Sequence, residues 1–515
     1  MAYFTGSQRH LLMKNKLPAF FILICVLMLN NQVRGQNEAT GIFDDHSDVG
    51  NVKHPGNVSY HKVDQEYLIE GSGENMWFAE DQFHFLWSSI QGDFILRAHV
   101  KFVGEGVDPH RKLGWMVRNN FHSDAEHVNA AVHGDGLVSL QYRTERGGQT
   151  EEITSKDTSP DVVQLERRGD TFIMGTAKMG QPLVEVTLDQ NPLNNEVFVG
   201  LYVCSHNPDV VEKAIFSNVR ITKPFDESKE RYTDYLGSRM EVLDMESLER
   251  KVLFTSKHSL QAPNWTVDGK ALIYNSNGYL YRYDLDSEMT GMVNTGFADQ
   301  NNNDHVLSFD GRQIAISSHD DDDNGDSAIY TLPLEGSDKP VRITKRGLGA
   351  SYLHGWSIDA KDLLFTGNRN GQYDIYRVNI ETGQETQLTD TPGLDDGPEF
   401  DPSGKYIYFN SNRTGTMQIY RMLPDGSEVE QLTFDELNDW FPHISPDGKK
   451  MVFVSFGTDV DSGDHPFYKH VYLRMMPVEG GTPQIISYVY GGQGTINVPS
   501  WSPDSKKIAF ISNTD

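Results

Sequence analysis

Histidines and carboxylates recur at corresponding positions of a repeated unit in the C-terminal half of the chain, near the strand that opens each unit. With two neighbouring polar or aromatic residues they form the set Asp304, His305, His354, Asp396, Glu399, Trp440, His443 and Asn497. If the opening strands converge, imidazole and carboxylate groups would meet, which suits a divalent metal or acid–base chemistry. The candidates for catalysis are His305, His354, Glu399 and His443, and the others are candidates for ligand binding. No motif such as HExxH accompanies them, so capping of a water-filled space is the favoured expectation.

The repeated unit consists of a strand, a turn of the Ser-Pro-Asp-Gly type and an apolar strand, followed in five of six copies by a strand centred on a tyrosine. The turn residues are Asp268, Asp310, Asp359, Ser403, Asp447 and Asp504, and the tyrosines are Tyr281, Tyr330, Tyr376, Tyr420 and Tyr472. The tyrosines lie 49, 46, 44 and 52 residues apart, which is the length of one four-stranded blade. The repeat therefore predicts a six-bladed β-propeller whose opening strands line a central channel.

The sixth repeat lacks two strands. After Trp501 it contains one further apolar strand, residues 507–512. Two strand-like runs without a place in the repeat, 239–245 and 251–255, precede the first blade. Pairing them with 507–512 would complete the sixth blade and cover edges that otherwise invite aggregation. We therefore expect the ring to close between the two ends of the propeller domain.

Residues 40–224 show no such repeat. Short runs there alternate apolar and polar residues, for example over 93–102 and 112–118, with Gly, Asp and Asn between them. This alternation predicts antiparallel strands with one buried face, as in a β-sandwich. The charged and aromatic segment 225–238 is expected to be a linker, so that an all-β chain divides into a sandwich at 36–224 and a propeller at 239–515.

The first 35 residues are expected to be a signal peptide. Basic residues precede an apolar run at 17–29, and Val33 and Gly35 supply the small residues expected before a cleavage site. The apolar run is too short to span a bilayer, and no other segment reaches transmembrane length. The sequence thus predicts export, to the periplasm or to the medium.

The chain is strongly acidic, with a net charge of −28. Cleavage after residue 35 would remove four basic residues and no acidic ones, and would lower the net charge to −32. Such a surface repels nucleic acid and anionic membranes, so neither is an expected partner. Only Cys204 would remain after cleavage, so two apolar cores must hold the fold without a disulfide.

The N-terminal half carries a second set of candidate ligand-binding residues: His110, Arg111, Arg118, His133, Tyr142 and Arg143. Aromatic rings stack on sugar C–H groups, and planar Arg donors recognise hydroxyl, carboxylate or sulfate oxygens. In the run 113–118, the period of two places Trp115 on one face and Arg118 on the other. Trp115 is therefore expected in the core and Arg118 at a ligand. No paired-glutamate strand motif of the glucanase kind is present, which argues against hydrolysis by this half.

Two acidic segments, 320–326 and 459–464, are expected at hairpin tips. Asp320, Asp322, Asp459 and Asp461 are the candidates for a metal site, because carboxylates beside glycine suit calcium. Neither segment matches the twelve-residue calcium loop, and acidic tips are commonly just solvated. No cofactor is certain from the sequence, and calcium or another divalent cation is the one that these tips suggest.

The glycine-rich segment 488–497 (YVYGGQGTIN) has two interpretations. Its glycines could let backbone approach a ligand closely, with Gln493 and Asn497 as ligand-binding side chains. It could equally be a tight connection between two blades.

The segment 71–91 (GSGENMWFAEDQFHFLWSSIQ), together with 109–112, 116–118 and 131–136 (AVHGDG), resembles concanavalin-A-like jelly-roll domains. The repeated half resembles the TolB-type propellers, and the pair is similar to a two-domain architecture of bacteria. The resemblance covers essentially the whole chain after the signal segment. It implies the fold but no activity, because such propellers serve as transport accessories, peptidase partners and lyases.

Three functional hypotheses follow. The first is a monomeric extracytoplasmic binding protein, whose sandwich and propeller engage a glycan, such as an acidic polysaccharide, or a partner protein of the envelope. The second is a polysaccharide lyase or hydrolase with its site at the propeller mouth. The third, by analogy with TolB, is a subunit of a cell-envelope complex. The lack of a catalytic motif places the binding protein first.

Overall fold

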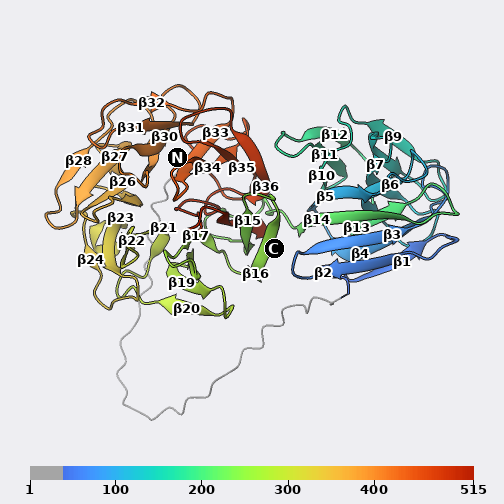
Figure 1. Cartoon of the computed structure of the whole chain (residues 1–515), viewed down its shortest axis with the longest axis horizontal. Helices are drawn as coiled ribbons and strands as arrows, with labels where there is room; N and C mark the ends of the chain where they lie inside the picture. Colours follow the sequence, from blue (N-terminus) through green and yellow to red (C-terminus); the bar gives the residue numbers. More distant parts are fainter. Residues whose placement is uncertain (1–38, 515) are drawn as a thin grey trace, which may run out of the picture.

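The computed structural model describes residues 39–514, which form a sandwich and a ring of blades side by side (Figure 1). The predicted signal peptide lies outside the described residues. Within 39–514 the strands pair in antiparallel fashion, and the one helical segment is the 3₁₀ turn η1 (Asp321–Asp323). No helix in this part of the chain is long and apolar enough to cross a membrane. The predicted all-β class is confirmed.

Two seven-stranded sheets make up the sandwich. The first has the order β1 (Asp45–Val49), β4 (Phe83–Gln91), β13 (Glu196–Cys204), β6 (Lys112–Arg118), β7 (His127–His133), β8 (Val138–Arg143) and β9 (Glu151–Thr154). The second has the order β12 (Val184–Leu188), β11 (Thr171–Ala177), β10 (Val162–Arg168), β5 (Phe94–Val103), β14 (Glu212–Thr222), β3 (Glu66–Gly71) and β2 (Asn57–His61). Neighbours in space are often distant in sequence, so the sheets form only when the whole domain is assembled.

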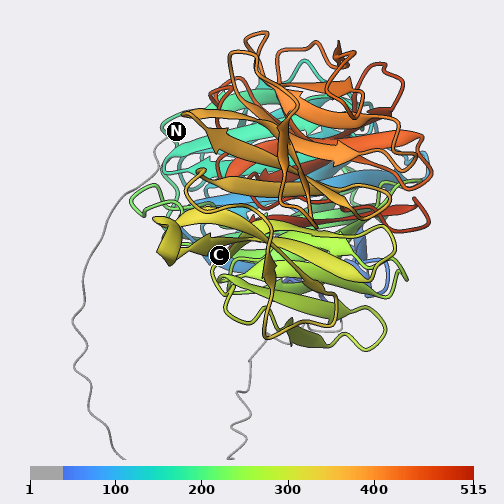
Figure 2. The same ribbon diagram turned by 90° about the vertical axis from the view of Figure 1, so that its left-hand side faces the viewer.

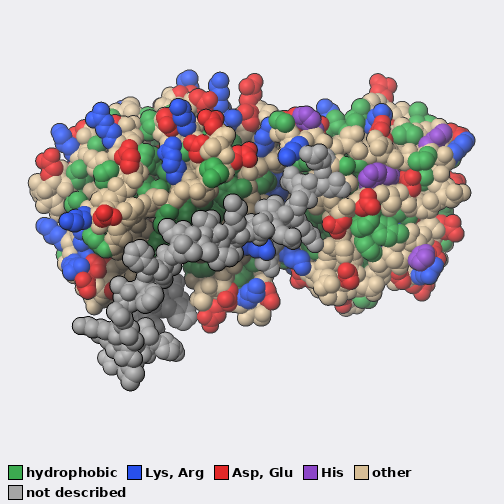
Figure 3. All heavy atoms as spheres, turned by 90° about the horizontal axis from the view of Figure 1, so that it is seen from below, with side chains coloured by type: hydrophobic (Ala, Val, Ile, Leu, Met, Phe, Trp, Pro, Cys, Tyr) green, Lys and Arg blue, Asp and Glu red, His purple; other side chains and the backbone are tan. Residues whose placement is uncertain are grey.

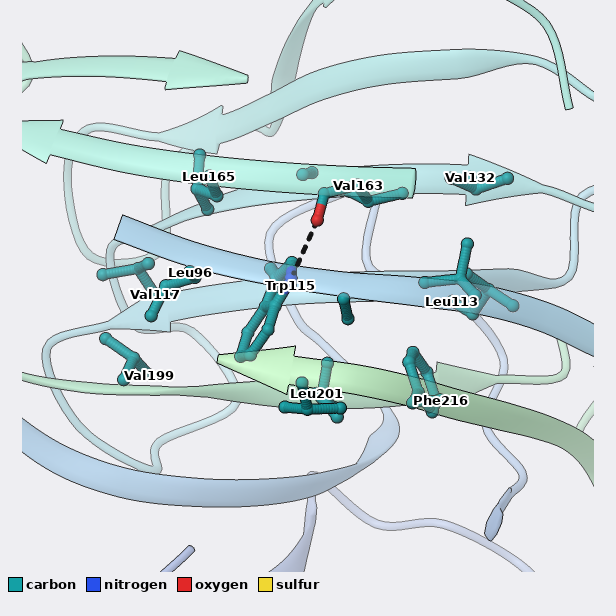
Figure 4. Packing of buried hydrophobic residues seen from close by; sticks show 14 of the residues in the cluster. Leu96, Leu113, Trp115, Val117, Val132, Val163, Leu165, Val199, Leu201 and Phe216 are labelled. Carbon is teal, nitrogen blue, oxygen red and sulfur yellow. Dashed lines mark hydrogen bonds between the residues drawn. The ribbon is translucent and has the colours of Figure 1, made fainter. Parts of the chain in front are cut away.

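The sandwich core lies between these sheets and includes the alternating residues of β6. Leu113, Trp115 and Val117 all belong to this core, as their period of two predicts. Trp115 is fully buried, and its indole N–H donates to the carbonyl of Val163 on the opposite sheet, at 3.2 Å (Figure 4). The assignment of Trp115 to the core is thus confirmed, and its polar atom has a partner, as a buried indole requires.

Five four-stranded blades follow in the ring. Blade one contains β17 (Gln261–Trp265), β18 (Ala271–Ser276), β19 (Tyr279–Asp284) and β20 (Thr290–Val293). Blade two contains β21 (Asn301–Leu307), β22 (Gln313–Asp320), β23 (Asp326–Pro333) and β24 (Val341–Arg342), and blade three β25 (Ser351–Trp356), β26 (Asp362–Arg369), β27 (Gln372–Asn379) and β28 (Glu385–Gln387). Blade four contains β29 (Asp395–Phe400), β30 (Ile407–Ser411), β31 (Gln418–Met422) and β32 (Glu430–Gln431), and blade five β33 (Asn438–Ile444), β34 (Lys450–Phe456), β35 (Lys469–Pro477) and β36 (Gln484–Gly491).

The sixth blade joins the two ends of the domain. β15 (Gly237–Asp244) pairs on one side with β16 (Arg250–Ser256) and on the other with β37 (Lys507–Thr514). An isolated bridge between Trp501 and Ile508 adds the innermost segment. The predicted closure is confirmed. β15 begins at Gly237, inside the segment that the sequence assigned to the linker, because the ladder extends to the pair Gly237–Thr514.

The Ser-Pro-Asp-Gly turns have a local cause. In the second blade, for example, the Ser308 hydroxyl donates to the Asp310 carboxylate at 2.7 Å, and the same carboxylate accepts the Arg312 N–H at 3.0 Å. Equivalent serine–aspartate bonds occur at Asp359, Asp447 and Asp504. Side chains of this kind stabilise turns by imitating backbone hydrogen bonds, which explains why the turn is the most regular part of the repeat.

The sandwich lies beside the sixth blade and β36 (Figure 1), and in the view turned by 90° it lies behind the ring (Figure 2). The Gln65 side chain bonds both the N–H and the carbonyl of Val252 on β16, at 3.0 and 2.8 Å. It thereby covers an edge strand, which proteins rarely leave bare. Arg97 of β5 donates to the Tyr488 carbonyl of β36 at 2.6 Å.

Glu241 on β15 is the centre of this interface and is fully buried. Arg220 of the sandwich and Arg250 of β16 bind its two oxygens at 2.5 and 2.7 Å, and Ser512 of β37 also donates to it. Burial alone would raise the pKa of Glu241, but the two guanidinium groups outweigh that effect and hold the pKa far below its usual value. One carboxylate therefore ties the sandwich to both sides of the closing blade.

The substitution Glu241→Gln should lower the free energy of unfolding by about 3–5 kcal/mol, because it leaves two buried guanidinium groups without their counter-charge. Since the pKa of Glu241 lies below its ordinary 4.5, this contribution is present above about pH 4.5 and is lost on acidification. Denaturant unfolding at pH 7 and pH 3 measures both effects. Glu246→Gln, at an exposed position in the turn after the same strand, is the control, and equal stabilities of the two variants would contradict the prediction.

Candidate functional site

The inner strand of each of the five complete blades carries a β-bulge at the level of the predicted polar residues. The pairing register shifts after Gln261, Asn301, Leu353, Asp396 and Trp440, in blades one to five respectively. A bulge interrupts the alternation of side chains and re-aims them. Residues that are neighbours in sequence can therefore both reach the channel, which a strict period of two forbids.

His354 and Asp396 form the central pair of the channel. His354 Nε2 lies 3.1 Å from Asp396 Oδ1, and the same oxygen accepts the Thr366 hydroxyl at 2.6 Å. Burial lowers the pKa of His354, but Asp396 and the nearby Asp304 more than compensate, so the pKa lies above its ordinary value. Burial raises the pKa of Asp396, and His354 outweighs this and lowers it. The pair is thus a buried histidine–aspartate contact in which each group favours the charged form of the other.

Asp304 and His465 complete the group, which we call the acid–imidazole cluster (Asp304, His354, Asp396 and His465). Burial, with a contribution from Asp396, raises the pKa of Asp304 to about 7, against the opposing effect of His354. His465 Nε2 lies 3.9 Å from Asp396 Oδ2. His465 Nδ1 is buried without a hydrogen-bond partner among the described residues. The cluster combines a proton donor, a proton acceptor and unsatisfied polar atoms.

His465 was absent from the sequence-based candidates. It lies in the loop between β34 and β35, directly after the acidic segment 459–464, and not on an inner strand. Its ring packs edge-on against Trp440 at 4.4 Å between centroids. The sequence feature that could have identified His465 as a candidate is its position directly after an acidic loop tip.

His305 and His443 were predicted as catalytic candidates, but their rings form hydrogen bonds that support the fold. His443 Nδ1 lies 2.6 Å from Glu399 Oε2, and its Nε2 lies 2.6 Å from the Ile496 carbonyl. Both ring nitrogens are therefore engaged, and Glu399 is occupied as well. His305 is fully buried against the Ile273 carbonyl at 3.2 Å, and burial lowers the pKa of its ring to about 4. His305 Nδ1 has no hydrogen-bond partner among the described residues, but the ring is fully buried, so neither imidazole is accessible to a substrate.

The glycine-rich loop closes part of the channel. The Ile496 carbonyl meets His443, and the backbone of Asn497 forms a hydrogen bond with His354. Asn497 itself holds the loop, since its Oδ1 accepts the Gly494 N–H at 2.8 Å and its Nδ2 donates to Gln493 at 3.2 Å. Gly492 has φ of 121°, and a Cβ there would lie 2.0 Å from the Pro466 carbonyl. Gln493 and Asn497 thus shape the loop, and the backbone approaches histidines of the same chain.

The first acidic tip is neutralised by arginines. Asp320 pairs with Arg342 and, at 3.0 Å, with Arg346, while Asp322 lies 3.3 Å from Arg346. Across residues 39–514, no group of three or more His, Cys, Asp or Glu side chains has the arrangement of a metal site. The donor set therefore does not fit calcium, and the prediction of a site at Asp320 and Asp322 is wrong because basic side chains occupy their oxygens.

The second tip lies beside the channel. Asp459 pairs with Lys469 at 3.3 Å. Asp461 lines a cavity of about 400 Å³ together with Gln372 and Tyr373 of blade three and Leu394 of blade four. This tip belongs to the same loop as His465, so the cavity and the acid–imidazole cluster adjoin through one segment.

In the sandwich, Arg118 and Arg143 are buried and do not face solvent. Both bind the buried carboxylate of Asp81, Arg143 at 2.8 Å and Arg118 at 3.4 Å. Asp81 belongs to the segment before β4, which also contributes Met76 to a small apolar cluster on the outer face of the sheet. The expectation of a ligand at these arginines is wrong, because the segment around Asp81 covers the face on which Arg118 lies.

The other sandwich candidates are dispersed. Arg111 forms a buried pair with Glu212 at 2.6 Å, and the Tyr142 hydroxyl donates to Glu151 at 2.9 Å. The rings of His110 and His133 do lie together, 5.9 Å apart between centroids. Trp440, the aromatic candidate of the channel, is fully buried and contacts the acid–imidazole cluster through the ring of His465.

Comparison with known proteins agrees with the ring geometry. Residues 323–464 match the family model for the TolB β-propeller domain. The uncharacterised protein Atu1656 of Agrobacterium fabrum is 44% identical over 277 residues, which are 54% of this chain and 92% of that protein. The solved structure of a candidate TolB from Agrobacterium tumefaciens is 43% identical, covers 55% of this chain and 99% of its own, and has a TM-score of 0.52. TolB from Acinetobacter baumannii is similar at 15% identity and a TM-score of 0.40, over 64% of this chain and 80% of its own.

A six-bladed ring closed between its two ends defines the class as a β-propeller protein. The chain belongs to the TolB-like β-propeller family.

Asp304→Asn should make the protein more stable at pH 8 and leave it unchanged at pH 4. Because the folded-state pKa of Asp304 is about 7 against an ordinary 3.8, the folded protein holds a proton that the unfolded chain has released, and stability falls as the pH rises between these values. Removing the carboxyl should recover roughly 2–4 kcal/mol at pH 8. Denaturant unfolding of both proteins from pH 4 to pH 8 measures this, and parallel pH profiles would refute it.

Proposed function

We propose that the protein is a binding protein of the cell exterior or envelope whose ligand is held at the mouth of the propeller channel. The observation that carries this proposal is the set of polar groups without partners around the acid–imidazole cluster. Among the described residues, His465 Nδ1 and Trp440 Nε1 are buried without hydrogen-bond partners. Buried polar groups are normally satisfied, so this ring of atoms supports a site that water or a ligand completes.

The chemistry of the mouth favours a neutral, hydroxyl-rich glycan. Carboxylates accept hydrogen bonds from sugar hydroxyls, and Asp304, with its pKa near 7, also exists as a donor at neutral pH. The neighbouring cavity adds Gln372 and the half-buried ring of Tyr373, and aromatic faces suit sugar C–H groups. An anionic polysaccharide would meet the carboxylates of Asp304, Asp396 and Asp461, so the acidic ligand considered from the sequence is disfavoured here.

A second candidate function is acid–base chemistry at the same mouth, in a glycan hydrolase or lyase. It is favoured by the presence of a carboxyl with a pKa near 7 and a histidine–aspartate pair in one cluster, since catalytic groups are often tuned in this way. Two further catalytic candidates of the sequence, His305 and His443, are engaged elsewhere. Binding without turnover therefore remains the first proposal.

The location outside the cytoplasm rests on the basic, apolar and small-residue pattern of residues 1–35. Membership of the TolB-like family supports an envelope role. A protein segment of an envelope complex is accordingly the alternative occupant of the mouth.

The test is binding of the purified protein to a panel of neutral and anionic oligosaccharides by titration calorimetry, with reducing and unsaturated ends followed on the same samples. Asp396→Asn should weaken binding of a neutral oligosaccharide by about 10–100-fold, because it removes charge-assisted hydrogen bonds. Asp390→Asn, an exposed carboxylate at the end of blade three, should have no effect.

Asp304→Asn serves as a second variant, since it is expected to fold at least as well as the wild type. New chain ends that disappear with this variant would favour the enzyme over the binding protein. Absence of binding to every sugar would reject the glycan proposal and point to a protein partner.

A further inference from the structure

The two domains enclose a second cavity, of about 730 Å³, that neither forms alone. The sandwich contributes Tyr60, Ser88 and Lys223 to its wall, and the propeller contributes Arg239 and Thr255. Its size lies within the range of small-molecule sites. No member of the acid–imidazole cluster lines it, so it is separate from the channel mouth. The domain contacts at Glu241 and Gln65 hold its two walls together, which makes the cavity preformed.

Arg239 is the charged group that sets the character of this cavity. Its guanidinium donates to the Ile221 carbonyl and, at 3.2 Å, to the Thr222 hydroxyl. These bonds fix its orientation and use two of its five N–H groups. Among the described residues it forms no ion pair. Arg239 is partly exposed to the cavity, so an anionic group bound there could supply the partner that its guanidinium lacks.

The negative charge closest to Arg239 is shared with other cations. Glu241 acts on Arg239 electrostatically, but its two oxygens already bind Arg220 and Arg250. Burial and then the proximity of Arg220 lower the pKa of Arg239 to about 9, against the opposing effect of Glu241. A bound anion would offset the repulsion from Arg220.

A second cation lies on the same wall. Lys223 donates its ammonium group to the Gln91 carbonyl and, within residues 39–514, also forms no ion pair. Two carboxylates, Asp44 and Glu196, also line the cavity and keep their negative charge, since the hydrogen bonds that they accept at 3.0 Å come from the neutral N–H and hydroxyl of Ser89. Both are exposed, so water and salt screen their charge. Lys and Arg side chains are also visible where the two domains meet in the view from below (Figure 3).

We propose that the interdomain cavity binds a small organic anion, a molecule with a carboxylate, sulfate or phosphate group, through Arg239 and Lys223. The planar guanidinium matches the oxygens of such a group. The ring of Tyr60 and the hydroxyls of Ser88 and Thr255 provide both an apolar face and polar contacts for the remainder of a sugar-sized ligand. Because both domains contribute, the ligand also links them, and its binding stabilises their association.

The test uses the whole protein and four probes: galactose, galacturonate, galactose 6-sulfate and galactose 6-phosphate. At least one anionic probe should bind with a stoichiometry of one in titration calorimetry, more weakly as salt increases, while galactose should not bind at this cavity. The three anions distinguish the acid groups from one another. Arg239→Gln should weaken the binding at least tenfold, and Lys223→Gln several-fold, each because one charge-assisted contact is lost.

Lys339→Gln, at an exposed position in blade two, is the matched control and should bind as the wild type does. Because Arg239 also forms hydrogen bonds with two sandwich residues, the thermal stability of its variant is compared with that of the wild type. If that variant is unstable, Lys223→Gln decides, because it loses only a bond to a carbonyl. Failure of all anions to bind, galactose binding that Lys223→Gln weakens as much as it weakens anion binding, or normal anion binding by a folded Lys223→Gln would each overturn the proposal. Asp396→Asn should leave anion binding intact, which separates this site from the channel mouth.

Discussion

The buried carboxylate of Glu241 is the contact on which the arrangement of both domains depends. It lies on β15, the strand that closes the ring between β16 and β37, and it binds a guanidinium from the sandwich and another from the propeller. Breaking such a group apart leaves buried charges uncompensated, which costs several kcal/mol. Ring closure and domain docking are therefore coupled through one side chain, and the sandwich is held as a fixed wall beside the propeller.

The channel mouth is a consequence of repetition combined with local irregularity. Six similar blades bring their inner strands to one axis, and a bulge at the same level of five of them turns polar side chains into the channel. Two of the histidines gathered there hold the ring and the glycine loop together, while His354 and Asp396 form a buried pair beside a carboxyl with an elevated pKa. The channel thus separates supporting imidazoles from those that remain able to meet a ligand.

The residues of the sandwich that the sequence predicted to bind a ligand are largely structural. Its outer sheet face is covered by the segment around Asp81, whose carboxylate binds two buried arginines. The arginines that we expected to bind a sugar at that face form buried ion pairs with Asp81 instead. The ligand site that we propose for this domain lies instead at its junction with the propeller, where Arg239 and Lys223 form no ion pair with any residue of the range 39–514.

The sequence by itself determined the all-β class, the six blades, the closure by residues from both ends, and the core position of Trp115. These follow from periods of two and of one blade length, which are local or strictly repeated signals. It also placed His354, Asp304 and Asp396 at one level of the channel.

Which polar side chains remain free to bind a ligand depends on tertiary contacts. Bulges shift the alternation, His465 arrives from a distant loop, Asp81 claims Arg118 and Arg143, and two domains meet to form a cavity around Arg239. Each of these features depends on contacts between residues far apart in the chain. Such contacts also set the free energy of burying a charge, and the spacing of residues in the sequence does not reveal them.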